Sequence, residues 1–312
     1  MKKLYIILGA ILSVLIVVIL ASGFYFFKFA EIRNDNTENE AASISTVRTK
    51  DFEKNNDFIK QNGIDWKIKS SDDFQLVGKY LPAQQKTNKT VILIHGYKSD
   101  HTSMSDYAAM FNKMGYNILM PDNRASGKSE GKYIGYGYLD AKDYLLWIDE
   151  VLSKNGQESE ILVMGESMGA ATTMMLSGMN PPQQVKCYIE DAGYSSVAEE
   201  IKYQAKSMFH LPNWISSFMI PVVSTYSKVF AGYDYYQASA TELLKNNDRP
   251  MLFIHGESDD FVPTKFIDEV YPATKGRKEK YPVPGAKHVQ SYAKNPKRYE
   301  ETVKSYTEKY FK

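Results

Sequence analysis

Cysteine is nearly absent from this chain of 312 residues, in which Cys187 stands alone. A single cysteine excludes an internal disulfide, and it fits an exported or a cytosolic protein equally well. An excess of charge is also lacking, since 38 Lys and Arg face 37 Asp and Glu. A net charge of +1 gives no overall positive field. We therefore expect no nucleic-acid partner.

Long apolar runs are confined to the start of the chain. An uncharged run from Leu4 to Phe27 follows Lys2 and Lys3. As a helix it would be about 36 Å long, enough to cross a hydrocarbon core of roughly 30 Å. The alternative is a cleaved signal peptide with its site at 21–23, but the apolar run continues past that site. We expect residues 1–29 to form an uncleaved transmembrane signal anchor.

Positive charges lie on both sides of this run. Lys2, Lys3 and the amino terminus precede it, and Lys28 and Arg33 follow it. Positive charge tends to stay in the cytoplasm. We expect a single-pass protein of the cell membrane whose globular domain lies on the extracellular side.

Residues 30–62 are polar and predict a tether with some helix near 52–60. Residues 63–312 then alternate short β-type runs with longer helical stretches, which predicts one domain of the α/β class. Its sheet is expected to have eight mostly parallel strands with helices on both faces. The first two strands, 64–69 and 74–81, should pair as an antiparallel hairpin at the edge. The other expected strands are 91–94, 117–120, 161–164, 185–189, 251–254 and 278–283.

One segment, at about 194–247, is too long for a plain strand–helix unit. It contains Phe209, Trp214, Phe218 and Met219 at irregular helical spacing. We interpret it as a short helical cap over the sheet. An additional helical pair packed on the core is the alternative.

The clearest chemical signal is Gly165-Glu166-Ser167-Met168-Gly169. It follows an apolar strand and precedes a helix that starts with small residues. A strand, a sharp turn and a helix are what a nucleophile elbow requires, because the glycines allow the turn and the serine hydroxyl is exposed at the helix N-terminus. Ser167 is therefore the expected nucleophile, and Gly165 and Gly169 shape the elbow.

A serine nucleophile needs a base, and the chain has only five histidines. His95 and His255 each end an apolar strand and precede a glycine, which is typical of residues that shape a loop. His101 lies in a polar loop and His210 in the expected cap. His288 follows the last strand in a loop that could reach the sheet edge, so it is the expected base.

The base in turn needs an acid. Asp259 lies just past a strand, and the order Ser167, Asp259, His288 is that of nucleophile-elbow hydrolases. Asp191 and Asp260 remain alternatives. For the oxyanion we expect two backbone N–H donors, from Met168 after the nucleophile and from Tyr97 in the loop after strand 91–94.

With these motifs the sequence resembles the α/β-hydrolase superfamily over roughly residues 64–312. The motifs occur in family order: His95-Gly96, the turn 121–129, the elbow, His255-Gly256 with Asp259, and Gly285 with His288. It looks most like single-pass, membrane-anchored bacterial hydrolases related to cinnamoyl esterases and to the catalytic domains of prolyl-oligopeptidase-type enzymes. In the turn, Ala125-Ser126 replaces the Gly-His of many relatives.

This resemblance implies a serine hydrolase that cleaves small or medium carboxylic esters through an acyl-enzyme. Action on short peptides or acylated amines is one alternative, and a non-catalytic membrane-tethered binding protein is another. Gly127-Lys128-Ser129 lacks the first glycine of a phosphate loop, since position 122 is Asp. No His-Glu-x-x-His string is present. We therefore expect no cofactor and no metal, and the partners are an acyl ester and the membrane.

Two further expectations concern the ends of the chain. Residues 275–312 contain 11 Lys and Arg against 4 Glu. This basic segment predicts either a solvated helix or a face turned toward anionic head groups. Because the motifs all follow the tether, we also expect a protein without residues 1–29 to keep its activity on small esters.

Overall fold

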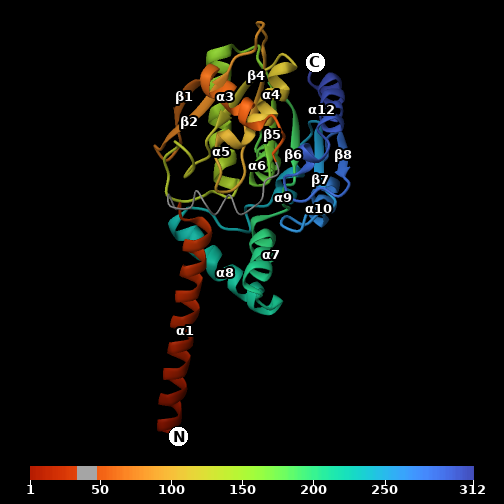
Figure 1. Cartoon of the computed structure of the whole chain (residues 1–312). Coiled ribbons are helices and arrows are strands. Elements are labelled where there is room, and N and C mark those ends of the chain that lie inside the picture. The colour runs from red at the N-terminus through yellow and green to blue at the C-terminus, as the bar shows by residue number, and fades with distance from the viewer. Residues whose placement is uncertain (34–47) are drawn as a thin grey trace.

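The computed structural model describes residues 1–33 and 48–312, and an eight-stranded sheet forms its centre (Figure 1). Residues 34–47 of the expected tether lie outside the described residues. The strands are β1 (Ile64–Lys69), β2 (Gln75–Leu81), β3 (Lys89–Ile94), β4 (Asn117–Pro121), β5 (Glu160–Glu166), β6 (Val185–Asp191), β7 (Met251–Gly256) and β8 (Lys278–Val283). Their order across the sheet is β1-β2-β4-β3-β5-β6-β7-β8.

The strand pairing confirms the expected fold class. β2 pairs with β1 and with β4 in the antiparallel sense, and the remaining neighbours pair in parallel. The hairpin of β1 and β2 lies at one edge. In the register of β3 and β5, Ile94 lies opposite Gly165, so the chain after β3 leaves the sheet beside the elbow.

Helices cover both faces of the sheet. They are α3 (Phe52–Asn62), α4 (Ser105–Lys113), α5 (Tyr138–Asn155), α6 (Met168–Ser177), α9 (Ala240–Leu244), α10 (Lys265–Ala273), α11 (Ser291–Lys294) and α12 (Pro296–Tyr310), with a short 3-10 turn at His101–Met104. Alternate residues of a strand point to opposite faces. Ile92 and Ile94 accordingly pack in the core with α5 and α6, whereas Val91 and Leu93 pack in the core with α4 and α12.

Part of the expected tether is packed on the domain. α3 contacts α4, and the Asn55 side chain donates a hydrogen bond of 2.8 Å to the Asp106 carboxylate. The Arg48 guanidinium donates to the Ser103 carbonyl at 2.9 Å. Residues 48–62 therefore belong to the surface of the domain.

Three helices extend beyond the sheet on the side where the parallel strands end (Figure 1). They are α1 (Lys2–Glu31), α7 (Val197–Phe209) and α8 (Asn213–Phe230). α1 is long enough and apolar enough to cross a membrane, and its residues 2–18 are all exposed. α7 and α8 form a hairpin in the region expected to be the cap, and α8 packs against the last turns of α1.

The basic C-terminal segment lies far from α1, which favours the solvated helix over a face turned toward head groups. Figure 1 shows α12 and the C-terminus at the end of the domain remote from α1. The charged face of α12 is solvated, since Lys304 and Glu308 pair at 3.8 Å with more than 60% of both side chains exposed. The simpler reading of this segment as a solvated terminal helix therefore holds.

Candidate active site

Ser167 is the single residue between β5 and α6. Its backbone has φ 58° and ψ −118°, a conformation that costs energy for any residue with a side chain. Close packing produces this turn: a Cβ on Gly165 would lie 2.0 Å from the Gly169 carbonyl oxygen, and a Cβ on Gly169 would lie 2.0 Å from that of Ile94. Both elbow positions therefore admit only glycine.

The three predicted side chains meet in one line of hydrogen bonds. Ser167 Oγ lies 2.9 Å from His288 Nε2, and His288 Nδ1 lies 2.8 Å from Asp259 Oδ2. All three residues are buried, with exposures of 6–8%. With Nδ1 protonated and donating to Asp259, Nε2 is left as an acceptor for the serine proton. This is the arrangement that general-base activation of a serine requires.

The loop after β7 holds the Asp259 carboxylate in its charged form. Oδ1 accepts backbone N–H bonds from Phe261 at 3.0 Å and Val262 at 2.9 Å. Burial opposes ionisation, but contacts with His255 and His288 outweigh it and lower the pKa of Asp259 to about 2. The carboxylate is therefore negative throughout the neutral range.

The two alternative acids lie elsewhere. Asp191 is buried and accepts hydrogen bonds from Ser291 and Tyr299, both at 2.9 Å, so its two oxygens are used to fasten α11 and α12 to the end of β6. Asp260 is exposed. The carboxylate that hydrogen-bonds to the His288 ring is that of Asp259.

Three of the other histidines have structural partners, and His210 is exposed in the α7–α8 connection. His95 lies between the Gly96 carbonyl and the Asn123 amide, which fixes the loop after β3. His101 bonds to Asp122. His255 Nε2 donates to the Val262 carbonyl at 2.9 Å and lies 3.4 Å from Asp259 Oδ2. His255 is thus a second histidine beside Asp259. From the sequence we expected His255 only to shape a loop.

The expected oxyanion donors flank Ser167. Met168 is the first residue of α6, where backbone N–H groups have no acceptor within the helix. Gly96, just before Tyr97, approaches so closely that a Cβ there would lie 3.4 Å from Ser167 Cβ. The loop after β3 therefore runs directly beside the hydroxyl.

Three buried glutamates lie around the site. Burial raises the pKa of Glu166, next to Ser167, to about 7. Burial likewise raises the pKa of Glu190 in β6 and of Glu200 in α7 to about 8. At neutral pH Glu190 and Glu200 therefore favour the uncharged form, whereas Asp259 beside His288 is ionised.

A cavity of about 380 Å³ opens in front of Ser167. α7 and α8 each contribute one face to it, and the sheet side contributes Tyr97, Met168 and Tyr194. The lining residues on α7 are Glu200, Ile201, Gln204, Ala205, Met208 and Phe209, and those on α8 are Ser216, Met219, Ile220 and Val223. The hairpin is therefore the roof of the site.

The last turns of α1 form the remaining wall. Phe26, Phe29 and Ala30 line the same cavity as Ser167. Phe27 and Glu31 on the other side of this turn are fully buried in the domain. Sequence reasoning missed these residues, because the apolar run gave no sign that its end belongs to the core.

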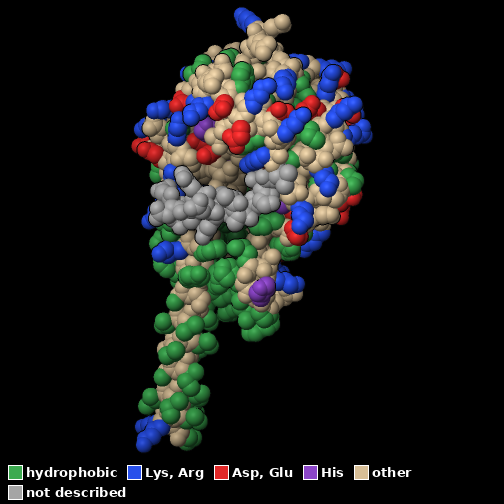
Figure 2. All heavy atoms as spheres, viewed as in Figure 1, with side chains coloured by type: hydrophobic (Ala, Val, Ile, Leu, Met, Phe, Trp, Pro, Cys, Tyr) green, Lys and Arg blue, Asp and Glu red, His purple; other side chains and the backbone are tan. Residues whose placement is uncertain are grey.

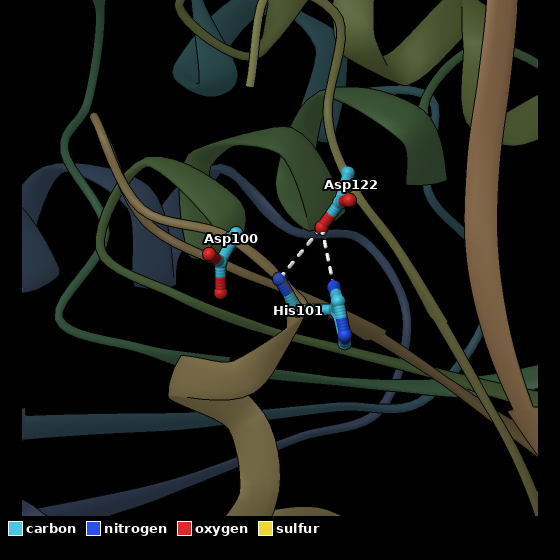
Figure 3. Close-up of side chains that lie close together, drawn as sticks. All are labelled: Asp100, His101 and Asp122. Atoms are coloured by element: carbon cyan, nitrogen blue, oxygen red, sulfur yellow. Dashed lines mark hydrogen bonds and ion pairs between the residues drawn. The ribbon is translucent and has the colours of Figure 1, made fainter. Parts of the chain in front are cut away.

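Asp100, His101 and Asp122 lie close together in the loops after β3 and β4, and His101 bonds to Asp122 (Figure 3). Their spacing could suit a metal ion, but their atoms are already engaged. Asp122 accepts from the amide and ring of His101 at 2.8 and 2.7 Å and from the Lys128 amide at 2.8 Å. Asp100 accepts from the amide and hydroxyl of Thr102. The cluster shapes the loops behind the site.

Known proteins share this architecture. A family model described as serine aminopeptidase, S33 matches residues 85–228. The structure of the Pyrococcus furiosus esterase Pf2001 superimposes with a TM-score of 0.63 and 25% identity, covering 80% of this chain and 92% of that one. This is the α/β-hydrolase fold. A Pyrococcus horikoshii acylaminoacyl peptidase has the same α/β-hydrolase fold over 43% of its own chain, with a TM-score of 0.60 and 20% identity.

One sequence relative covers nearly the whole chain. The uncharacterized protein YqkD of Bacillus subtilis is 27% identical over 307 residues, which cover 98% of this chain and 97% of YqkD. The uncharacterized protein YfhR of Escherichia coli K12 is 23% identical over 72% of each chain. The similarity to YqkD thus includes the segment of α1 as well as the domain built on the sheet.

Proposed function

We propose that this protein is a membrane-anchored serine hydrolase that cleaves carboxylic esters, with Ser167 as nucleophile, His288 as base and Asp259 as acid. The observation that carries the proposal is the line of hydrogen bonds at 2.9 and 2.8 Å through the His288 ring. A binding protein on the same fold would have no need to keep Ser167 in a strained backbone conformation.

In this proposal the reaction follows acyl transfer in two stages. His288 Nε2 takes the proton of Ser167 as Oγ attacks the ester carbonyl, and the resulting imidazolium is stabilised by Asp259. The backbone N–H groups of Tyr97 and Met168 stabilise the oxyanion. His288 then gives its proton to the leaving alcohol. In the second stage His288 takes a proton from a water molecule that attacks the acyl group, and it returns the proton to Ser167 as the carboxylic acid leaves.

The membrane anchor is the second part of the proposal. A signal peptide is removed by cleavage and is absent from the mature protein. In this structure, however, Phe27, Ala30 and Glu31 of α1 are buried in the domain, and three residues of α1 line the cavity. These contacts support retention of α1. The charges around the span favour a domain on the extracellular side, which an alkaline phosphatase fusion after Lys312 would test by its activity in intact cells.

One residue favours a second candidate, the hydrolysis of short peptides or acylated amines. Glu200 lines the cavity, and its Oε2 has no hydrogen-bond partner within residues 1–33 and 48–312. A substrate ammonium group beside it would supply a partner and restore its negative charge. Ester substrates need no such group, so Glu200→Gln should abolish amide cleavage under this candidate and leave ester cleavage largely intact.

The test uses the full-length protein in detergent or nanodiscs with a fluorophosphonate probe and a panel of p-nitrophenyl esters. We expect labelling of the wild type and, for Ser167→Ala, no labelling and a rate lower by about 10³ or more. Ser177→Ala is the matched control, since its hydroxyl bonds only within α6. Wild-type protein that is folded but neither labelled nor active would overturn the proposal.

A further inference from the structure

The tip of the α7–α8 hairpin carries no acidic side chain, lysine or arginine, and its one histidine is His210. No Asp, Glu, Lys or Arg occurs over the 21 residues 207–227, between Lys206 and Lys228. Large apolar side chains nevertheless project outward there: Trp214 is 73% exposed, Phe218 52% and Met208 54%. An apolar patch of this kind on a protein surface indicates a contact with another apolar phase.

This patch is continuous with α1. The ring of Phe209 contacts those of Phe26 and Phe29 at centroid distances of 5.2 and 5.4 Å, and the Tyr226 hydroxyl donates to the Leu20 carbonyl at 3.1 Å. Figure 2 shows hydrophobic side chains running from α1 onto the hairpin, whereas Lys, Arg, Asp and Glu side chains gather on the sheet domain. The hairpin and the membrane-length helix therefore share one apolar surface.

The length of α1 sets the depth of the hairpin. If Lys2 and Lys3 mark the far face of the bilayer, a hydrocarbon core of roughly 30 Å takes about 20 residues and ends near Gly23. α8 runs beside α1 from the level of Leu20. Lys28, Lys206 and Lys228 are exposed and would lie at the head groups, where long cationic side chains are favourable. The hairpin tip then lies at the boundary of the near leaflet.

The opening of the cavity faces the same boundary. Of the side chains that line it, the most exposed are Met208 at 54% and Phe29 at 38%, one from α7 and one from α1. Both are apolar. A water-borne substrate would gain nothing from such an opening, while a hydrocarbon chain could pass through it without leaving an apolar environment.

We infer that the cavity of Ser167 opens into one leaflet of the bilayer between α1 and the α7–α8 hairpin, and that the substrate is an ester with a long hydrocarbon chain dissolved in that leaflet. The membrane span is then a wall of the acyl site as well as an anchor. This inference rests on the proposed function, because it takes Ser167 as the nucleophile. Its test therefore reports on position in the membrane and on chain length separately from labelling of Ser167.

The native tryptophans allow a direct test of position. Trp214 lies on the hairpin, while Trp66 and Trp147 are buried in the domain at 8% and 1% exposure. Full-length protein is placed in nanodiscs of phosphatidylcholine with or without bromine on the acyl chains. We expect brominated lipid to quench the emission of the wild type and to have little effect on Trp214→Phe. Equal emission of the wild type in both lipids would overturn the inference.

The preference for the length of the acyl chain tests whether the end of α1 forms a wall of the cavity. The ratio of kcat/KM for p-nitrophenyl laurate to that for the butyrate is measured in nanodiscs, with the active sites counted by fluorophosphonate. We expect Phe26→Ala and Phe29→Ala to lower this ratio by about tenfold or more, since each removes apolar surface that only the longer chain reaches. Tyr25→Ala is the control, because Tyr25 is on the same helix but is 58% exposed and does not line the cavity.

The outcomes separate the two proposals. A labelled, active enzyme whose Trp214 is not quenched, or whose laurate-to-butyrate ratio is the same in Phe26→Ala and Tyr25→Ala, contradicts the inference and leaves the hydrolase intact. Loss of Trp214 quenching together with cross-linked pairs of chains would assign the apolar patch to a second copy of this protein. Absence of labelling in a folded wild type would contradict the proposed function itself.

Discussion

The Tyr97 hydroxyl donates a hydrogen bond of 2.7 Å to the main-chain carbonyl oxygen of Ala30. Ala30 lies in the last turn of α1, where carbonyl groups have no donor within the helix. Tyr97 lies in the loop after β3, and its amide is the proposed second oxyanion donor. The end of the membrane-length helix is thus bonded directly to the loop beside the proposed nucleophile.

Removal of this hydroxyl should affect turnover. We expect Tyr97→Phe to lower kcat by about five- to tenfold, because one hydrogen bond is worth about 1 kcal/mol and here it positions the oxyanion loop. Tyr136→Phe is the control, since Tyr136 donates to the same oxygen at 3.1 Å from outside that loop. Both variants should lose similar thermal stability, and equal kcat values would contradict the positioning role.

The contact between α1 and α8 depends on Gly23. A Cβ at this position would lie 2.6 Å from Val222 Cγ1 and 3.2 Å from the Tyr226 ring. Gly23→Leu should therefore separate the two helices and reduce ester hydrolysis in nanodiscs. Gly9→Leu makes the same change in the same helix where nothing lies within 4 Å, and it should keep wild-type activity.

Removal of residues 1–29 tests more strongly whether α1 contributes to the cavity. The sequence led us to expect that a protein without residues 1–29 keeps its activity on small esters. The structure reverses that expectation, because truncation removes Phe26 and Phe29 from the cavity wall and Phe27 from the core. We now expect the truncated protein to be less stable and less active, and full activity after truncation would show that α1 serves only as an anchor.

The two buried aspartates should separate by phenotype. Asp259→Asn is expected to lower kcat by about 10⁴. The asparagine side chain can donate a hydrogen bond to His288 Nδ1, which favours the tautomer with its proton on Nε2, and that tautomer cannot accept the proton of Ser167. Asp191→Asn weakens the bonds to Ser291 and Tyr299 and should lower the melting temperature with much less effect on kcat. If Asp191→Asn damages kcat more, the assignment of the acid is wrong.

Glu190 predicts how stability depends on pH. Burial raises its folded-state pKa from 4.5 to about 8, so the folded protein binds a proton that the unfolded chain has released between these values. Its contribution to stability is therefore full below about pH 4.5 and is lost as pH rises through about 8. Glu190 Oε2 accepts from the Gly193 amide at 3.0 Å, a bond that glutamine can keep.

Thermal unfolding at pH 6 and pH 9 measures this effect. The wild type should lose stability over this interval, on the order of one to a few kcal/mol, and Glu190→Gln should lose less. Glu257→Gln replaces an exposed glutamate and should follow the wild type. An unchanged pH dependence in Glu190→Gln would show that Glu190 is not protonated in the folded state.

The sequence was informative wherever a local pattern has a local cause. The elbow could be predicted because Gly165, Ser167 and Gly169 lie within one turn whose geometry demands them. The ends of the strands were predicted within two residues, because parallel strands that are buried on both faces form continuous apolar runs. Chain order and the small number of histidines led to His288 and Asp259.

Contacts between distant segments could not be predicted in the same way. Nothing in the run from Leu4 to Phe27 indicates that Phe26 faces a cavity and Tyr25 faces away. A helix that is apolar on all sides has no alternation of polar and apolar residues to show which side is buried. The contact of His255 with Asp259, at 3.4 Å, could not be predicted either, because it depends on how the loop after β7 folds back toward the strand. The stretch without Asp, Glu, Lys or Arg between Lys206 and Lys228 was the one available sign of an unusual surface.

The attachment of α7 to the Asp259 loop has a consequence for how the substrate preference of this protein could change. The Tyr203 hydroxyl and the Gln204 amide bond to the carbonyls of Asp260 and Phe261 at 2.7 and 2.8 Å, and the same loop holds Asp259 through its amides. A movement of α7 away from the cavity would therefore have to break these bonds or displace the loop that carries Asp259. Evolutionary changes of substrate preference should then accumulate on α8, at the end of α1 and at the other lining residues of α7, while Tyr203 and Gln204 stay constant.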